Sequence, residues 1–316
     1  MGFELILPFL RPIAHLIEDP DVTEVMVNGS RLVFVERDGA VERVDGVELE
    51  ERNLIIAVRN IARALGDDVS EEKPILDSRL PDGSRVAAVI PPCSVGGTTL
   101  TIRKFQRRWF TSAELVRAGS LSPEALEVVR EAVRRNKNIL ISGGTGTGKT
   151  TFLAAFASYI PEADRVVLIE DTAEVELSLE NVVRFEARRE LPGLPAVTIR
   201  DLLRATLRHR PDRIIVGEIR GGEAFDLLQA LNTGHAGSLS TIHANSPEDA
   251  LTRLAGCVVQ SGVELPYAIV RRQLAATVGL VLHLERRHGK RCLSTLIEVK
   301  GYDPSTDQYQ TTRTEF

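Results

Sequence analysis

The stretch NILISGGTGTGKTT, residues 138–151, constrains the fold of this chain more than any other. It predicts a buried strand, then the loop Gly143-x-x-x-x-Gly148-Lys149-Thr150, then a helix that starts with TFLAAFASY. Glycines in such a loop let successive backbone N–H groups turn inward around an anion, and the following helix adds its N-terminal dipole. Strand, loop and helix in this order form a P-loop, and a chance glycine-rich turn is the weaker explanation.

The P-loop predicts a site for ATP with Mg²⁺. We expect Lys149 to bridge the β- and γ-phosphates and Thr150 to hold the metal ion. The predicted cofactor-binding residues are Gly143, Gly144, Thr145, Gly146, Thr147, Gly148, Lys149, Thr150 and Thr151.

Acidic residues follow two further apolar stretches. VVLIEDTAEVEL offers Glu170, Asp171 and Glu174, and RIIVGEIRGGEA offers Glu218. Open α/β sheets bind ligands at the carboxyl ends of their strands, so these carboxylates are candidates for handling metal and water, with Glu170 and Glu218 as metal groups beside Thr150. Capping a strand or pairing with a surface arginine is the alternative for each.

The strand pattern predicts two domains. From residue 113 to 316, helices alternate with the apolar stretches NILIS, RVVLIE, DRIIVGE, GSLSTIH and VGLVLHL, which is typical of a mostly parallel sheet covered by helices. Residues 1–105 predict a small α+β domain, because hairpins around Asn-Gly, Asp-Gly and Pro-Asp-Gly flank the amphipathic helix ERNLIIAVRNIARALG. We place the interdomain linker at residues 106–112, and we favour a hinge there over a lipid or nucleic-acid contact.

Composition narrows the class of protein. A net charge of −5 disfavours a surface that binds nucleic acid throughout, although a local basic patch stays possible. Cys93, Cys257 and Cys292 are far apart and predict reduced thiols rather than zinc ligands. The apolar start lacks the features of a signal peptide, and no stretch has the length of a spanning helix. We therefore expect a cytoplasmic protein that reaches a membrane only from the side.

Two histidines lie in TGHAGSLSTIHANS, residues 233–246. His235 and His243 are eight positions apart among small and hydroxyl-bearing residues. The local sequence leaves four roles open for these histidines: metal ligand, general base, phosphate sensor and ordinary surface residue. Further metal ligands are not evident nearby.

Several motifs together resemble the secretion-superfamily ATPases, the motors of type II and type IV secretion, type IV pili and conjugation. They are GGTGTGKTT, LIEDTAE, LRHRPDRIIVGEIRGGEAFDLLQALNTGH and GSLSTIHANSPEDAL, with DPDVTEVMVNG and LPDGSRVAAVIPP in the first domain. The resemblance is strongest to the branch that contains VirB11, TrbB and the Flp/Tad pilus ATPase CpaF. An eight-residue histidine spacing and the lack of a tetracysteine zinc module separate the chain from retraction and type II assembly motors.

This resemblance implies a RecA-like ATPase domain, a homohexameric ring and ATP bound between the two domains. It implies a partner that is a polytopic inner-membrane platform or channel protein, with the ATPase peripheral to that membrane. Glu174 would be the general base, and Glu218 would act on Mg²⁺ through water. His235 and His243 would report on the nucleotide. Arg85 and Arg103 match arginines that point at phosphates across a domain or subunit boundary.

Two other functions remain open. A DNA-stimulated RecA-like translocase would share this core, although the acidic balance predicts no stable nucleic-acid binding. The second is a nucleotide-binding scaffold without motor activity, and the two acidic motifs disfavour it. ATPase rates with and without single-stranded DNA, and phosphate release with Mg²⁺, separate these functions.

Overall fold

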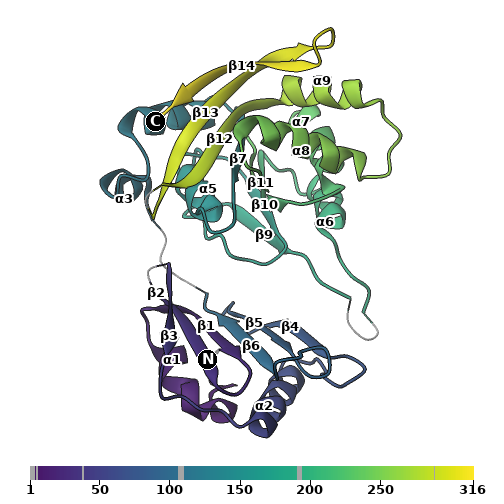
Figure 1. Ribbon diagram of the computed structural model, residues 1–316. Coiled ribbons are helices and arrows are strands. Elements are labelled where there is room, and N and C mark those ends of the chain that lie inside the picture. Colours follow the sequence, from purple (N-terminus) through teal and green to yellow (C-terminus); the bar gives the residue numbers. More distant parts are fainter. Residues whose placement is uncertain (1–3, 5, 38, 106–109, 191–193, 288) are drawn as a thin grey trace. The chain divides into compact units, whose positions relative to one another are not determined.

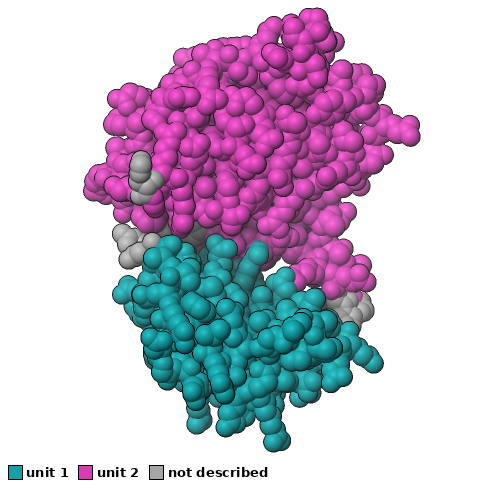
Figure 2. Space-filling view, in the orientation of Figure 1, with its two compact units in different colours: residues 1–108 teal, residues 109–316 magenta. Residues whose placement is uncertain are grey.

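The computed structural model describes residues 4, 6–37, 39–105, 110–190, 194–287 and 289–316. The chain divides into two compact units, residues 1–108 and 109–316, coloured separately in Figure 2. Residues 106–109 of the predicted linker lie outside the described residues. Its last residue, Ser112, already begins a helix whose N-cap is Thr111.

The first unit is a six-stranded antiparallel sheet with helices packed on it (Figure 1). The strand order is β3-β2-β1-β6-β5-β4, and the Asn-Gly and Pro-Asp-Gly turns join neighbouring strands as predicted. Its elements are the 3-10 turns η2 (Leu7–Phe9) and η3 (Arg11–Ile13), helices α1 (Ala14–Glu18) and α2 (Glu51–Ala64), and strands β1 (Val22–Asn28), β2 (Leu32–Arg37), β3 (Ala40–Val44), β4 (Ile75–Arg79), β5 (Arg85–Val89) and β6 (Thr99–Arg103).

The second unit is an eight-stranded sheet in the order β14-β13-β12-β7-β11-β10-β8-β9. Strands β12 to β9 in that order are parallel, while β13 and β14 add an antiparallel edge. The strands are β7 (Asn138–Gly143), β8 (Val166–Glu170), β9 (Val182–Glu186), β10 (Arg213–Ile219), β11 (Leu239–His243), β12 (Val278–Arg287), β13 (Lys290–Asp303) and β14 (Gln308–Glu315). The predicted mostly parallel sheet is confirmed, and it has three further strands, β9, β13 and β14, beyond those predicted.

Helices cover both faces of this sheet (Figure 1). Leu140 of β7 packs into a core with α6 to α9, whereas its neighbours Ile139 and Ile141 pack into a second core with α3 to α5. The helices are α3 (Ser112–Arg117), α4 (Pro123–Arg134), α5 (Lys149–Ala157), α6 (Ile199–Thr206), α7 (Glu223–Asn232), α8 (Pro247–Val259) and α9 (Tyr267–Thr277). Among the described residues, no helix is both long and apolar enough to cross a bilayer.

Candidate nucleotide site

The P-loop joins the carboxyl end of β7 to the amino end of α5. Gly148 is the N-cap of α5 and has a φ of +91°, a left-handed conformation that favours glycine. A Cβ on Gly143 would lie 2.5 Å from the carbonyl oxygen of Leu284 in β12, so a side chain does not fit there. The first turn of α5 holds no acidic residue, which leaves its N–H groups and its dipole suited to an anion.

Lys149 lies inside this loop. Its Nζ donates to the carbonyl oxygens of Gly143 at 3.1 Å and Gly144 at 2.9 Å, and the side chain is buried. Burial lowers the pKa of Lys149. Thr147 Oγ1 donates to the Gly144 carbonyl at 2.9 Å and so holds the loop together. The ammonium group therefore occupies the place that phosphate oxygens would reach.

His243 connects the P-loop to Glu218. Strand β11 lies beside β7, and His243 is in register with Gly143. Its Nδ1 lies 3.4 Å from Lys149 Nζ, and its Nε2 lies 2.8 Å from Glu218 Oε1. Burial, and then the charge of Lys149, lower the pKa of His243. A neutral ring suits this position, because burial disfavours the charged form and Nδ1 faces the Lys149 ammonium, which is a donor.

The carboxylate of Glu218 lies between Arg220 and His243. Its Oε2 accepts hydrogen bonds from Nε of Arg220 at 2.9 Å and from Nη2 at 2.6 Å. Gly217 before it packs closely against Glu170, since a Cβ there would lie 3.0 Å from Cγ of Glu170. Arg220 was not among the predicted site residues, although it follows Glu218 by two positions at the end of the same strand.

Glu170 holds the loop after β8 rather than facing an open site. Its Oε1 accepts from the backbone N–H groups of Glu174 and Val175, each at 2.8 Å, and Oε2 lies 3.8 Å from Arg184 Nη2. Burial raises the pKa of Glu170 to about 7. Because Glu170 is buried and its Oε1 is used by the loop, we leave it out of the Mg²⁺ site that we propose. Its bonds instead fix the backbone of Glu174.

The structure does not bring the two histidines together. His235 precedes β11, with Nδ1 3.1 Å from the carbonyl oxygen of Ala230 in α7, whereas His243 ends β11. Oδ1 of Asn138, at the start of β7, accepts hydrogen bonds from the N–H groups of Gly237 and Ser238. The His235 end of β11 therefore lies at the edge of the sheet where the parallel strands begin. The strand between them spans about 13 Å at roughly 3.3 Å per residue. His243 thus lies at the P-loop edge of the sheet and His235 at the other edge, and their predicted role toward the nucleotide stays a prediction.

Arg85 and Arg103 lie in the first unit, where they are cross-strand partners on β5 and β6. Glu24 of β1 is opposite Arg103 on its other side. These two arginines thus lie side by side on one sheet, and their predicted role toward phosphate stays a prediction.

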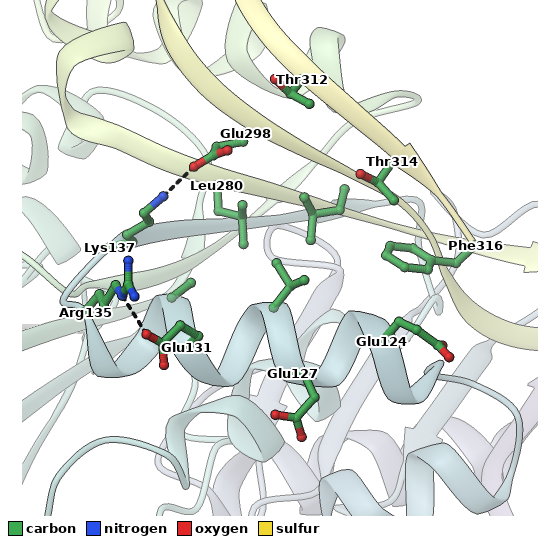
Figure 3. Close-up of a pocket in the computed structure, with 13 residues that line it drawn as sticks. Glu124, Glu127, Glu131, Arg135, Lys137, Leu280, Glu298, Thr312, Thr314 and Phe316 are labelled. Atoms are coloured by element: carbon green, nitrogen blue, oxygen red, sulfur yellow. Dashed lines mark hydrogen bonds and ion pairs between the residues drawn. The ribbon is translucent and has the colours of Figure 1, made fainter.

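A groove of about 720 Å³ lies between α4 and strands β12 to β14 of the second unit (Figure 3). Glu124, Glu127 and Glu131 line its helical side, and Thr312 and Thr314 line its strand side. None of the predicted nucleotide residues lines it.

Known proteins resemble this chain over nearly its full length. A family model described as "Type II/IV secretion system protein" matches residues 10–315. The type IV secretion system protein VirB11 of Brucella suis biovar 1 is 36% identical over 329 residues, covering 94% of this chain and 90% of the relative. The conjugal transfer protein TrbB of Rhizobium radiobacter is 34% identical over 299 residues, covering 93% and 88%.

Two solved structures are similar to this chain. The crystal structure of the VirB11 ATPase from the Brucella suis type IV secretion system, in complex with sulphate, is similar with a TM-score of 0.51 at 33% identity, over 96% of both chains. The pilus retraction motor PilT with bound ADP has a TM-score of 0.62 at 23% identity, covering 90% of this chain and 81% of that one, and supports the fold alone.

Proposed function

The chain belongs to the type II/IV secretion system protein family and is an ATPase, and we propose that it works as a homohexameric motor for protein secretion, conjugative transfer or pilus assembly. We place it in the cytoplasm, peripheral to the inner membrane, with a polytopic platform or channel protein as its partner. The observation that carries the proposal is the contact series from Lys149 through His243 to Glu218, which links the P-loop to the ends of two neighbouring strands.

Phosphate binding follows from the loop. The uncapped N–H groups of α5 and the ammonium of Lys149 suit the β- and γ-phosphates of ATP. Lys149 then exchanges its bonds to the carbonyls of Gly143 and Gly144 for bonds to phosphate oxygens. Thr150, on the first turn of α5, and Glu218 are the groups that would hold hydrated Mg²⁺. The metal ion would supply charge neutralisation for the transferring phosphoryl group.

Water activation is assigned to Glu174. The two backbone bonds to Glu170 fix the loop that carries it. His243 acts as the phosphate sensor, because it lies against Lys149 on one side and Glu218 on the other. When Lys149 turns toward phosphate, His243 loses a partner at Nδ1, and the change passes to Glu218 and β10.

Mechanical coupling is assigned to arginines outside the P-loop unit. Arg85 and Arg103, from another domain or subunit, would stabilise charge on the transferring phosphoryl group. Hydrolysis would then depend on how the units are placed, and phosphate loss would change that placement. His235, at the opposite edge of the sheet, would contribute only to a neighbouring subunit.

Two experiments test this function. The purified chain, mixed with Mg²⁺ and a slowly hydrolysed ATP analogue, should sediment as six copies of the 34.7 kDa chain, and a stable monomer under these conditions would contradict the ring. Cross-linking in cells should capture a polytopic inner-membrane protein of a secretion, conjugation or pilus system. Cross-links confined to cytosolic or nucleic-acid partners would contradict the assignment to the membrane.

A further inference from the structure

Arg220 joins the carboxylates of two strand ends with one guanidinium group. It follows β10, and its Nε and Nη2 both donate to Oε2 of Glu218. Its Nη1 donates to Oδ2 of Asp171 at 3.1 Å, in the loop after β8. Strand β10 pairs with β8, so this bridge crosses from one strand of the sheet to its neighbour. A single residue therefore connects the Glu218 side of the site with the loop that carries Glu174.

The backbone at Arg220 is itself fixed. Its N–H donates to Oε1 of Glu223 at 2.6 Å, and the N–H of Gly221 donates to the same oxygen at 2.8 Å. A Cβ on Gly222 would lie 2.9 Å from Cα of Ser261, so the turn is packed closely against the segment after α8. The guanidinium thus extends over Glu218 from a constrained turn.

The guanidinium of Arg220 is surrounded by carboxylates from both strand ends. Burial lowers its pKa, but the carboxylates of Glu218, Asp171 and Glu174 outweigh burial and raise it overall. Arg220 donates hydrogen bonds to Oε2 of Glu218, while Nε2 of His243 lies 2.8 Å from Oε1. The contact series from Lys149 consequently extends through Arg220 to the acidic loop.

We propose that Arg220 is a positioning residue that keeps Glu218 and the loop from Asp171 to Glu174 in one arrangement, so that both carboxylate groups meet the nucleotide together. This inference rests on the ATPase function proposed for the same site. The side chains of Arg220 and Asp171 are 56% and 47% exposed, so their ion pair contributes little to stability. Substitution of Arg220 should therefore change the site without unfolding the chain.

The test separates turnover from binding. Arg220→Ala should lower kcat about tenfold or more, while the KM for ATP and the calorimetric affinity for ADP change less than about twofold. Arg220→Lys should recover only part of the kcat lost in Arg220→Ala. The lysine ammonium keeps the positive charge, but it lacks the planar fork that reaches two carboxylates at once. Arg204→Ala is the matched control, since Arg204 is 58% exposed and pairs with Asp226 between α6 and α7. It should leave kcat unchanged.

A second measurement needs no turnover. In the nucleotide-free protein, hydrogen exchange of residues 171–177 should be faster in Arg220→Ala than in the wild type, and unchanged in Arg204→Ala. Wild-type kcat in Arg220→Ala, or unchanged exchange in this loop, would overturn the proposal. If the wild-type protein itself released no phosphate, the proposed function would fail, while the exchange result would still decide the role of Arg220.

Discussion

Nε2 of His243 lies 2.8 Å from Oε1 of Glu218, while Nδ1 of the same ring lies 3.4 Å from the Lys149 ammonium. One ring therefore touches both the residue expected to bind phosphate and the residue expected to support the metal ion. The arrangement suits a group that responds to phosphate rather than one that anchors the nucleotide.

His243→Ala should reduce turnover more than binding. The loop amides and Lys149 remain to hold ATP, so we expect its Kd to change less than about threefold while kcat falls at least tenfold, or about 1.4 kcal/mol. Calorimetry with a slowly hydrolysed ATP analogue and steady-state phosphate release measure the two quantities. A large loss of affinity at normal kcat would instead make His243 a simple binding residue.

His235→Ala provides the comparison at the other end of β11. Because His235 contacts the Ala230 carbonyl and lies at the amino edge of the sheet, ATP affinity in its own subunit should stay unchanged. Any loss of turnover should appear only in the assembled protein, and dilution to monomers should abolish the difference from wild type. Weaker ATP binding by monomeric His235→Ala would contradict the placement.

Glu174→Gln should bind ATP and hydrolyse it very slowly. An amide cannot accept the proton of the attacking water, and loss of a general base costs about 10²–10⁴-fold in rate. Single-turnover measurements should show bound ATP that persists. Glu176→Gln is a suitable control, because Glu176 lies on the same loop and is exposed. Wild-type turnover in Glu174→Gln would move the base elsewhere.

Glu170→Gln should alter stability in a pH-dependent way. Its pKa of about 7 in the folded chain lies above the ordinary value of 4.5, so the folded state binds more protons between these values. Stability contributed by the protonated carboxyl is full below pH 4.5 and is lost as the pH rises through about 7. The loss is at most about 3 kcal/mol, since one pKa unit corresponds to about 1.4 kcal/mol.

The thermal midpoint of Glu170→Gln, relative to wild type, should therefore be higher at pH 8 than at pH 5. Exposed Glu180 supplies the control, because Glu180→Gln should show the same offset at both pH values. An offset for Glu170→Gln that does not change with pH would mean that the buried carboxyl titrates normally.

Single-stranded DNA should not stimulate hydrolysis. The chain carries a net charge of −5, and nucleic-acid translocases bind through cationic surfaces whose affinity falls steeply with salt. ATPase rates with and without DNA at low salt give the comparison. Strong stimulation that salt removes would favour the translocase function over the secretion motor.

The nucleotide loop could be predicted from sequence because its chemistry and its setting both depend on local residues. Glycines at 143 and 148, the apolar strand before them and the helix after them define the loop without distant contacts. The convergence of Glu218 and His243 also follows from strands that run parallel and end at one edge. The parallel core of the second unit was predictable for the same reason.

Other features depend on contacts between distant segments. The edge strand β14, QYQTTRTE, has no apolar alternation, and its backbone pairing with β13 alone defines it. The position of Glu170 at the end of β8 suggests a metal group, whereas its bonds to the backbone of the following loop are visible only in the structure. The role of Arg220 requires knowing that β10 lies next to β8. The separation of His235 from His243 likewise depends on the extended strand β11 that runs between them.

Phosphate release by the purified chain, compared between wild type and Lys149→Ala, tests the central claim most directly. Lys149 bonds to the P-loop carbonyls and lies beside His243, so its loss removes the cation on which phosphate binding and sensing both depend. We predict release that requires Mg²⁺ in the wild type and none above background in Lys149→Ala. Equal release by the two proteins, or no release by the wild type, would contradict an ATPase at this site.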